Sequence, residues 1–299
     1  MSTQNINNLV ELFFINYKKQ KKDNILLTSL KDTSNYFTWE KTFHSIKKLS
    51  SEIKKYANKG DRCLLISENR PEWFITDLSV MLSEAITVPA YTTYAEKDYE
   101  YIIENCNPKL IFVSNQEQFN KVKEIIKKKS FVVKIFSFEE LDIDTDTYIN
   151  VNKLFSNLDY QDLKVPDLSI KRNDPACIIY TSGTQGNPKG VILSHGGILN
   201  NCDGALDILK PLLTDQTRFL TWLPLSHSYE HTVQFVQISV GAKIFYAESI
   251  EKLIKNMNDC KPQLMTAVPR FYQNLFQKIN ASFNKVTGLK KKLILKMLE

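Results

Sequence analysis

The sequence has 299 residues, of which 43% are hydrophobic and 24% charged, and 39 Lys and Arg against 33 Asp and Glu give a formal net charge of +6. These proportions are typical of a soluble globular protein. No apolar run approaches the roughly 18 residues of a spanning helix, and no basic segment or cleavage site accompanies the apolar residues near the N-terminus. We therefore expect neither a transmembrane helix nor a secretory signal.

The charge and cysteine patterns narrow the class of partner. Five cysteines lie far apart without a C-x-x-C pair, which indicates buried thiols in a reducing cytoplasm and disfavours a zinc site. The positive charge suits anionic partners such as ATP, CoA or a phospholipid surface, but the lysine clusters fit solvated helix faces better than binding patches. We expect no nucleic-acid partner, and we leave open a homodimer and peripheral attachment to the inner face of a membrane.

Helical and strand patterns alternate through the first half of the chain. Thr38 is a candidate N-cap for a helix with an apolar stripe, and Gly60 is its candidate C-cap. Strands are expected over residues 63–67, 86–90, 110–113 and 132–136, separated by helices, with Asn69 as an N-cap before Pro71. This alternation predicts an α/β fold with a mostly parallel sheet, and residues 138–174 form an irregular, acidic connector.

Backbone freedom is concentrated in one stretch, because six of the nine glycines fall between residues 183 and 204. An apolar run over residues 176–180 predicts a buried strand, and a second run over 191–193 follows the loop. The loop combines glycines, hydroxyls and a lysine, which together form a phosphate cradle. Its candidate residues are Thr181, Ser182, Gly183, Thr184, Gly186, Lys189 and Gly190.

Two familiar nucleotide-binding loops do not fit this stretch. A Walker A loop needs a second glycine where Pro188 stands and Ser or Thr where Gly190 follows Lys189, and no G-x-G-x-x-G is present. A Gly-rich hairpin without a ligand is the structural alternative. A helix is expected from residue 198, and its positive end would face the same anion as the loop.

A second dense cluster covers residues 221–231 and holds two of the four histidines. The spacing of His227 and His231 would suit a metal pair on a helix. Pro224 and the loop composition argue against a helix here, and no third ligand of matching spacing is present, so we disfavour zinc.

Several strings resemble one enzyme family. Thr-Ser-Gly-Thr-x-Gly-x-Pro-Lys-Gly-Val over residues 181–191 resembles the signature loop of the adenylate-forming, or AMP-binding, enzymes, although Gln185 stands where that family usually has Thr or Ser. Leu-Pro-Leu-Ser-His-x-x-Glu over residues 223–230 resembles their second motif in the form seen in long-chain fatty acyl-CoA synthetases. The string Asn69-Arg70-Pro71-Glu72-Trp73 resembles the same branch, and packing alone does not explain it.

The resemblance implies a fold and a set of roles. The fold would be the large N-terminal domain of that superfamily, incomplete here, with residues up to about 170 as a first α/β subdomain and 171–299 as the start of a second. The loop residues from Thr181 to Lys189 would hold the β- and γ-phosphates of ATP, with Thr184 also a ligand of Mg²⁺. His227 would lie beside the acyl carboxylate, and Tyr229 or His231 would line or gate the acyl tunnel. A structural role for His231 remains the alternative.

The implied activity is the ATP-dependent conversion of a long-chain fatty acid to an acyl adenylate and then to acyl-CoA. Thr184, Lys189 and His227 would be the catalytic residues, with CoA as co-substrate. Two alternatives keep the adenylation step and change either the acid or the acceptor, which would be a carrier-protein thiol. A third alternative is that the chain is a non-catalytic ATP-binding remnant. No segment resembles the family's Tyr-Gly-x-Thr-Glu element, ribose-binding aspartate, hinge or C-terminal domain with its catalytic lysine. We therefore expect an N-terminal portion of such an enzyme, whose activity by itself is open.

Overall fold

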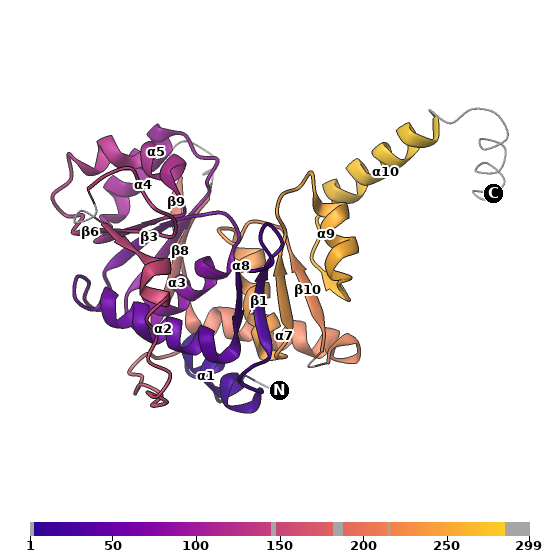
Figure 1. Cartoon of the computed structure of the whole chain (residues 1–299), viewed down its shortest axis with the longest axis horizontal. Coiled ribbons are helices and arrows are strands. Elements are labelled where there is room, and N and C mark those ends of the chain that lie inside the picture. Colours follow the sequence, from indigo (N-terminus) through magenta and orange to yellow (C-terminus); the bar gives the residue numbers. More distant parts are fainter. Residues whose placement is uncertain (1–2, 145–147, 182–187, 215, 285–299) are drawn as a thin grey trace. The chain divides into compact units, whose positions relative to one another are not determined.

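The computed structural model describes residues 3–144, 148–181, 188–214 and 216–284 (Figure 1). The chain divides into two compact units, Met1–Leu264 and Met265–Glu299. The first unit holds two mostly parallel sheets with helices, so the α/β class expected from the alternating pattern is confirmed. In the second unit, α10 (Pro269–Asn284) is the described helix.

One sheet has seven strands in the order β7-β6-β5-β3-β4-β8-β9. Neighbouring strands are parallel except for β8 and β9, which form an antiparallel hairpin. Because these parallel strands point the same way, the loops that follow them meet at one edge of the sheet. The strands are β3 (Arg62–Ile66), β4 (Ile86–Ala90), β5 (Leu110–Val113), β6 (Lys134–Ser137), β7 (Tyr148–Asn150), β8 (Pro175–Thr181) and β9 (Lys189–Ser194).

The other sheet has five strands in the order β12-β10-β11-β1-β2. Strand β11 is parallel to both β10 and β1, whereas β2 pairs with β1 in antiparallel fashion. The strands are β1 (Ile25–Ser29), β2 (Tyr36–Thr38), β10 (Arg218–Thr221), β11 (Lys243–Tyr246) and β12 (Leu264–Met265). Both sheets take strands from both sides of residue 170, and the expected subdomain division there stays a prediction.

Helix α3 (Pro71–Leu82) is the central helix of the first unit, because all twelve of its residues are buried. It contacts β4 of one sheet and β1 of the other, and α2 (Trp39–Ile53) packs along it (Figure 1). The remaining helices of this unit are α1 (Leu9–Lys19), α4 (Glu96–Cys106), α5 (Gln116–Ile126), α6 (Val151–Phe155), α7 (His195–Leu209), η2 (Lys210–Leu212), α8 (Ser228–Ser239) and α9 (Leu253–Cys260).

The core joins helices that are distant in the sequence through large apolar side chains. Tyr17 of α1 stacks on Phe43 of α2 at a centroid distance of 4.2 Å, and Phe74 of α3 meets Phe235 of α8 edge to face at 5.7 Å. Burying each such side chain contributes about 1.5–3 kcal/mol. All five cysteines are buried free thiols, as expected from their spacing.

Three local expectations have different outcomes. The Thr38 side chain accepts a hydrogen bond from Lys41 N, so its role as N-cap is confirmed. Gly60 is not the C-cap, because the helix ends at Ile53; with φ of 80° it forms the turn before β3 instead. Asn69 is not an N-cap either: Arg70 occupies that position, without a capping side-chain bond.

The stretch expected to be an irregular connector contains β7 and the short helix α6. Three-residue and five-residue elements are too short to leave a periodic pattern in the sequence. Among the described residues no helix is both long enough and apolar enough to traverse a bilayer.

Candidate functional site

The strand ends that flank the glycine-rich loop lie at the edge of the seven-stranded sheet where its parallel strands end. Thr181 is the last residue of β8 and Lys189 the first of β9, and the two are register partners. The expected strand–loop–strand arrangement is therefore confirmed. Ser182, Gly183, Thr184 and Gly186 lie outside the described residues, so their phosphate-binding roles stay predictions.

The described residues of this loop are accessible to a ligand. Thr181, Lys189 and Gly190 are exposed. Lys189 forms no ion pair with any carboxylate in the described part of the chain. Gly190 has a packing reason as well, because a Cβ added there would lie 3.0 Å from Ile178 Cγ2 and 3.2 Å from Tyr180 Cζ. Absence of a side chain at residue 190 thus lets β9 lie close to the ring of Tyr180.

Helix α7 does not point its positive end at this loop, and that expectation was wrong. The helix begins at His195, directly after Ser194, whose register partner is Pro175 at the opposite end of β8 from Thr181. Six residue-to-residue steps along β8 separate Pro175 from Thr181, which is a distance of roughly 20 Å. The N-cap is Ser194, whose side chain accepts a hydrogen bond from Gly197 N at 3.1 Å.

The second motif follows β10 at the carboxyl edge of the five-stranded sheet and leads into α8. The expectation that no helix forms here was wrong for its second half, since α8 begins at Ser228. His227 is the N-cap, and its Nδ1 accepts a hydrogen bond from Tyr229 N at 3.2 Å. Accepting at Nδ1 requires a lone pair there, so a neutral His227 carries its proton on Nε2. The exposed imidazole therefore has an Nε2–H available as a donor.

His231 lies one helical turn further on and faces the interior. Its Nε2 is 2.7 Å from Asp77 Oδ2 of α3, and its Nδ1 is 3.5 Å from Cys177 Sγ of β8. The imidazole and the carboxylate are both completely buried. Burial by itself lowers the pKa of His231, but the Asp77 carboxylate outweighs it, and the pKa is raised to about 10.

This geometry fits the structural alternative for His231, because the side chain connects α8 to α3 and to the strand that carries the loop. Tyr229, in contrast, is 50% exposed. Of the three motif residues, His227 and Tyr229 face outward and His231 faces inward. The sequence did not indicate Asp77 or Cys177 as partners of His231, because they lie 154 and 54 residues away from it and no local pattern links residues at such separations.

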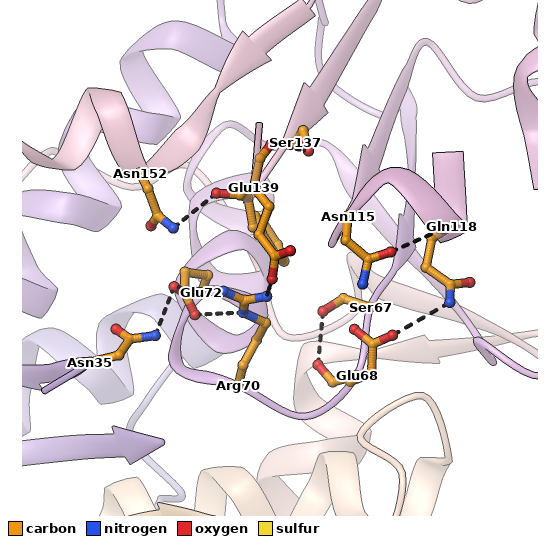
Figure 2. A network of polar contacts seen from close by, with 11 residues as sticks. Asn35, Ser67, Glu68, Arg70, Glu72, Asn115, Gln118, Ser137, Glu139 and Asn152 are labelled. Carbon is orange, nitrogen blue, oxygen red and sulfur yellow. Dashed lines mark hydrogen bonds and ion pairs between the residues drawn. The ribbon is translucent and has the colours of Figure 1, made fainter. Parts of the chain in front are cut away.

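Helix α3 begins in a polar network at the carboxyl edge of the seven-stranded sheet. Figure 2 shows the Arg70 guanidinium between two carboxylates: it donates to both oxygens of Glu72, at 2.9 and 3.2 Å, and to Glu139 Oε1 at 2.9 Å. Asn35 Nδ2 donates to Glu72 Oε1 at 3.0 Å. Burial raises the pKa of Glu72, but Arg70 and Asn35 reverse this effect and lower it.

A cavity of about 560 Å³ opens where strands of both sheets end. Carboxylates outnumber cations in its lining, so it suits a polar group better than an acyl chain. The lining residues are Ser29, Lys31, Asp32, Asn35, Glu68, Asn69, Arg70, Asn115, Glu117, Glu139, Ala247, Glu248 and Ser249. In the described part of the chain, no three His, Cys, Asp or Glu side chains gather as a metal site.

The fold and the paired motifs point to one protein family. The family of AMP-binding enzymes matches residues 14–295, so the chain belongs to that family. The match covers nearly the whole sequence and includes both motifs.

The chain is also similar to individual curated proteins and to solved structures. The chain is 28% identical to Long chain acyl-CoA synthetase 3 of Arabidopsis thaliana over 86% of its own length and 40% of the relative's. It is 28% identical to Fatty acyl-CoA synthetase A of Dictyostelium discoideum, over 78% and 36% of the two lengths. The crystal structure of a putative long-chain-fatty-acid CoA ligase from Rhodopseudomonas palustris superposes with a TM-score of 0.77 at 16% identity, over 92% of this chain and 66% of that one. The chain thus spans about two fifths of the length of these curated relatives and matches the N-terminal domain of the fold.

Proposed function

We propose that this chain supplies the phosphate-binding and carboxylate-binding part of a long-chain fatty acid–CoA ligase that forms AMP. The observation that carries the proposal is the connection between the two motifs. The strand that enters the signature loop and the helix that follows His227 meet at the Cys177–His231 contact. Both motifs also lie at the edge of a sheet where parallel strands end, which is where α/β folds bind ligands.

In the first step, a carboxylate oxygen attacks the α-phosphorus of ATP, and the bond from that phosphorus to pyrophosphate breaks. No protein nucleophile is required, so the protein's task is positioning and neutralisation of charge. Lys189, Thr181 and the predicted loop donors would hold the β- and γ-phosphates. Mg²⁺ bound with ATP would offset the same charge, with Thr184 as its predicted ligand.

His227 would act where two anions approach each other. Its Nε2–H can donate to a carboxylate or α-phosphate oxygen while its Nδ1 is kept as an acceptor by Tyr229 N. The N-terminus of α8 adds partial positive charge at the same place. Removing one such donor from a reaction that brings charge together typically lowers the rate by about 10²–10³.

In the second step, the CoA thiolate attacks the acyl carbon and AMP leaves. Relatives that are named as acyl-CoA synthetases favour CoA over a carrier-protein thiol as the acceptor. We place this reaction of fatty acid metabolism in the cytoplasm. Vesicle sedimentation would measure peripheral attachment of the chain to a membrane, and analytical ultracentrifugation would measure dimer formation.

The test is ATP–pyrophosphate exchange with a panel of acids. Exchange that depends on palmitate, and not on benzoate or amino acids, supports the proposed substrate class. Exchange with another acid supports an adenylating enzyme of different specificity, and comparing CoA with a carrier protein then identifies the acceptor. No exchange with any acid by this chain, together with weak ATP binding, would favour the non-catalytic remnant.

A further inference from the structure

The side chain of Asn69 connects the loop after β3 to the loop after β10. Its Nδ2 donates to Leu223 O at 2.7 Å, and its Oδ1 accepts from Leu225 N at 3.0 Å. The partners are 154 and 156 residues away in the sequence. Both polar atoms of the amide are therefore used on one short piece of distant backbone.

The piece of backbone that Asn69 holds is the second motif itself. Leu223 and Leu225 flank Pro224, which has no N–H to donate, and His227 N donates to Pro224 O at 3.0 Å to complete a turn. The two bonds to Asn69 thus fix the residues from which the His227 turn is built. We refer to residues 222–227 as the His227 loop.

The far end of the motif is held by α3, the helix that begins two residues after Asn69. Asn69 stands two residues before α3 begins at Pro71, and Asp77 in the middle of α3 pairs with His231 of α8. Every residue of α3 is buried, and the helix contacts a strand of each sheet, so it is a fixed reference for Asp77 and for the turn that carries Asn69. The segment around His227 is therefore held on both sides: by Asn69 at Leu223 and Leu225, and by Asp77 of α3 at His231.

We infer that Asn69 is a positioning residue, which holds the His227 loop so that the imidazole of His227 presents its Nε2–H at a fixed place. The claim about catalysis rests on the proposed function, whereas the claim that Asn69 fixes the loop does not. It also gives Asn69, the first residue of the string from Asn69 to Trp73, a physical purpose, which neither helix capping nor packing supplied.

A matched pair of substitutions separates positioning from stability. Asn69→Ala removes both bonds to the His227 loop. Asn8→Ala removes an equivalent pair elsewhere, because Asn8 Oδ1 accepts from Glu11 N at 2.8 Å and Asn8 Nδ2 donates to Ile170 O at 3.0 Å. Asn69→Asp is a milder variant that keeps the acceptor for Leu225 N and loses the donor to Leu223 O.

The readout is the ¹⁹F NMR spectrum of the 299-residue chain labelled with 5-fluorotryptophan. Trp222 lies in the His227 loop, and the other two tryptophans are the buried Trp39 and Trp73. Substituting Trp222→Phe assigns its resonance, and urea unfolding of each variant gives its stability.

We expect Asn69→Ala to displace or broaden the Trp222 resonance, Asn69→Asp to do so less, and Asn8→Ala to leave it in place despite a similar loss of stability. An unchanged Trp222 resonance in folded Asn69→Ala or Asn69→Asp protein would overturn the inference, as would an equal change in Asn8→Ala. Where exchange activity is present, Asn69→Ala should lower it at least tenfold more than Asn8→Ala. Absence of exchange in the unsubstituted chain would count against the proposed function and leave the NMR result decisive for Asn69.

Discussion

The buried pair between Asp77 and His231 makes a prediction about stability that depends on which partner is removed. In His231→Phe, the Asp77 carboxylate stays in a site without solvent, and its Oδ1 already has no hydrogen-bond partner among the residues that the structure describes. In Asp77→Leu, the remaining imidazole can lose its proton and keep its contact with Cys177. A buried carboxylate becomes neutral only by binding a proton, which at neutral pH costs more free energy than deprotonating an imidazole, so His231→Phe should be the more damaging change.

The magnitude follows from the burial and from the pKa. Both side chains have 0% exposure, and breaking such a pair by removing one partner costs about 3–5 kcal/mol. The pKa of His231 rises from 6.5 to about 10, which corresponds to roughly 4 kcal/mol at pH 7. We expect a loss near 4 kcal/mol for His231→Phe, about 2 kcal/mol for Asp77→Leu, and a double-variant loss well below their sum.

The sign of the pH dependence is fixed by the raised pKa. The folded state holds the His231 proton more tightly than the unfolded state does. The contribution of this pair to the free energy of unfolding is therefore fully present below pH 6.5 and is lost as the pH rises towards 10. Urea unfolding followed by circular dichroism at several pH values measures it. Asp77→Leu should remove this alkaline loss, and His44→Phe, a change at another buried histidine, should retain it. Additive single-variant losses, or an alkaline slope that survives Asp77→Leu, would refute the reasoning.

Three further predictions concern other parts of the first unit. Gly190→Ala should lower the free energy of unfolding by about 1–3 kcal/mol, because the added methyl group would crowd Ile178 and Tyr180. Gly204 lies in α7 with open space around it, so Gly204→Ala should raise the free energy of unfolding by up to about 1 kcal/mol. Equal effects of the two substitutions in denaturant unfolding would contradict the packing account. Burial lowers the pKa of His195 to about 4. The contribution of neutral His195 to the free energy of unfolding is therefore fully present above pH 6.5, and about 3 kcal/mol of it is lost as the pH falls to 4. His195→Gln should remove this loss when the free energy of unfolding is measured between pH 6.5 and 4. Glu72→Gln should cost about 3 kcal/mol, because it leaves Arg70 with one carboxylate partner; a neutral result in thermal unfolding would argue against the network.

Much of the fold could be predicted because its elements carry local patterns. Apolar runs between turn residues identified the strands at residues 86–90 and 110–113 with the bounds that the structure gives, and Thr38 showed the start of α2. The errors arose where local chemistry suggested one role and a distant partner supplied another. Asn69 is of a residue type that commonly caps helices, yet its side-chain amide binds a loop more than 150 residues away in the sequence.

The candidate site divides in the same way. The glycines, hydroxyls and lysine of the signature loop share one short stretch, so their pattern indicates anion binding without knowledge of the fold. The inward orientation of His231 depends on Asp77 and Cys177, which reach it through sheet order and helix packing. The placement of α7 away from the loop follows from the antiparallel register of β8 and β9, which no spacing in the sequence specifies.

The central claim is that the signature loop of this chain binds the phosphates of ATP through Lys189. Isothermal titration calorimetry with MgATP tests this claim directly on the 299-residue chain and on the variant Lys189→Ala. The control variant is Lys243→Ala, because Lys243 begins β11 at the amino-terminal edge of the five-stranded sheet. We predict one saturable site that Lys189→Ala weakens tenfold or more, since a charged hydrogen bond contributes about 1.5–3 kcal/mol, and that Lys243→Ala leaves unchanged. Absence of saturable binding by the folded chain, or equal weakening by both substitutions, would contradict the claim.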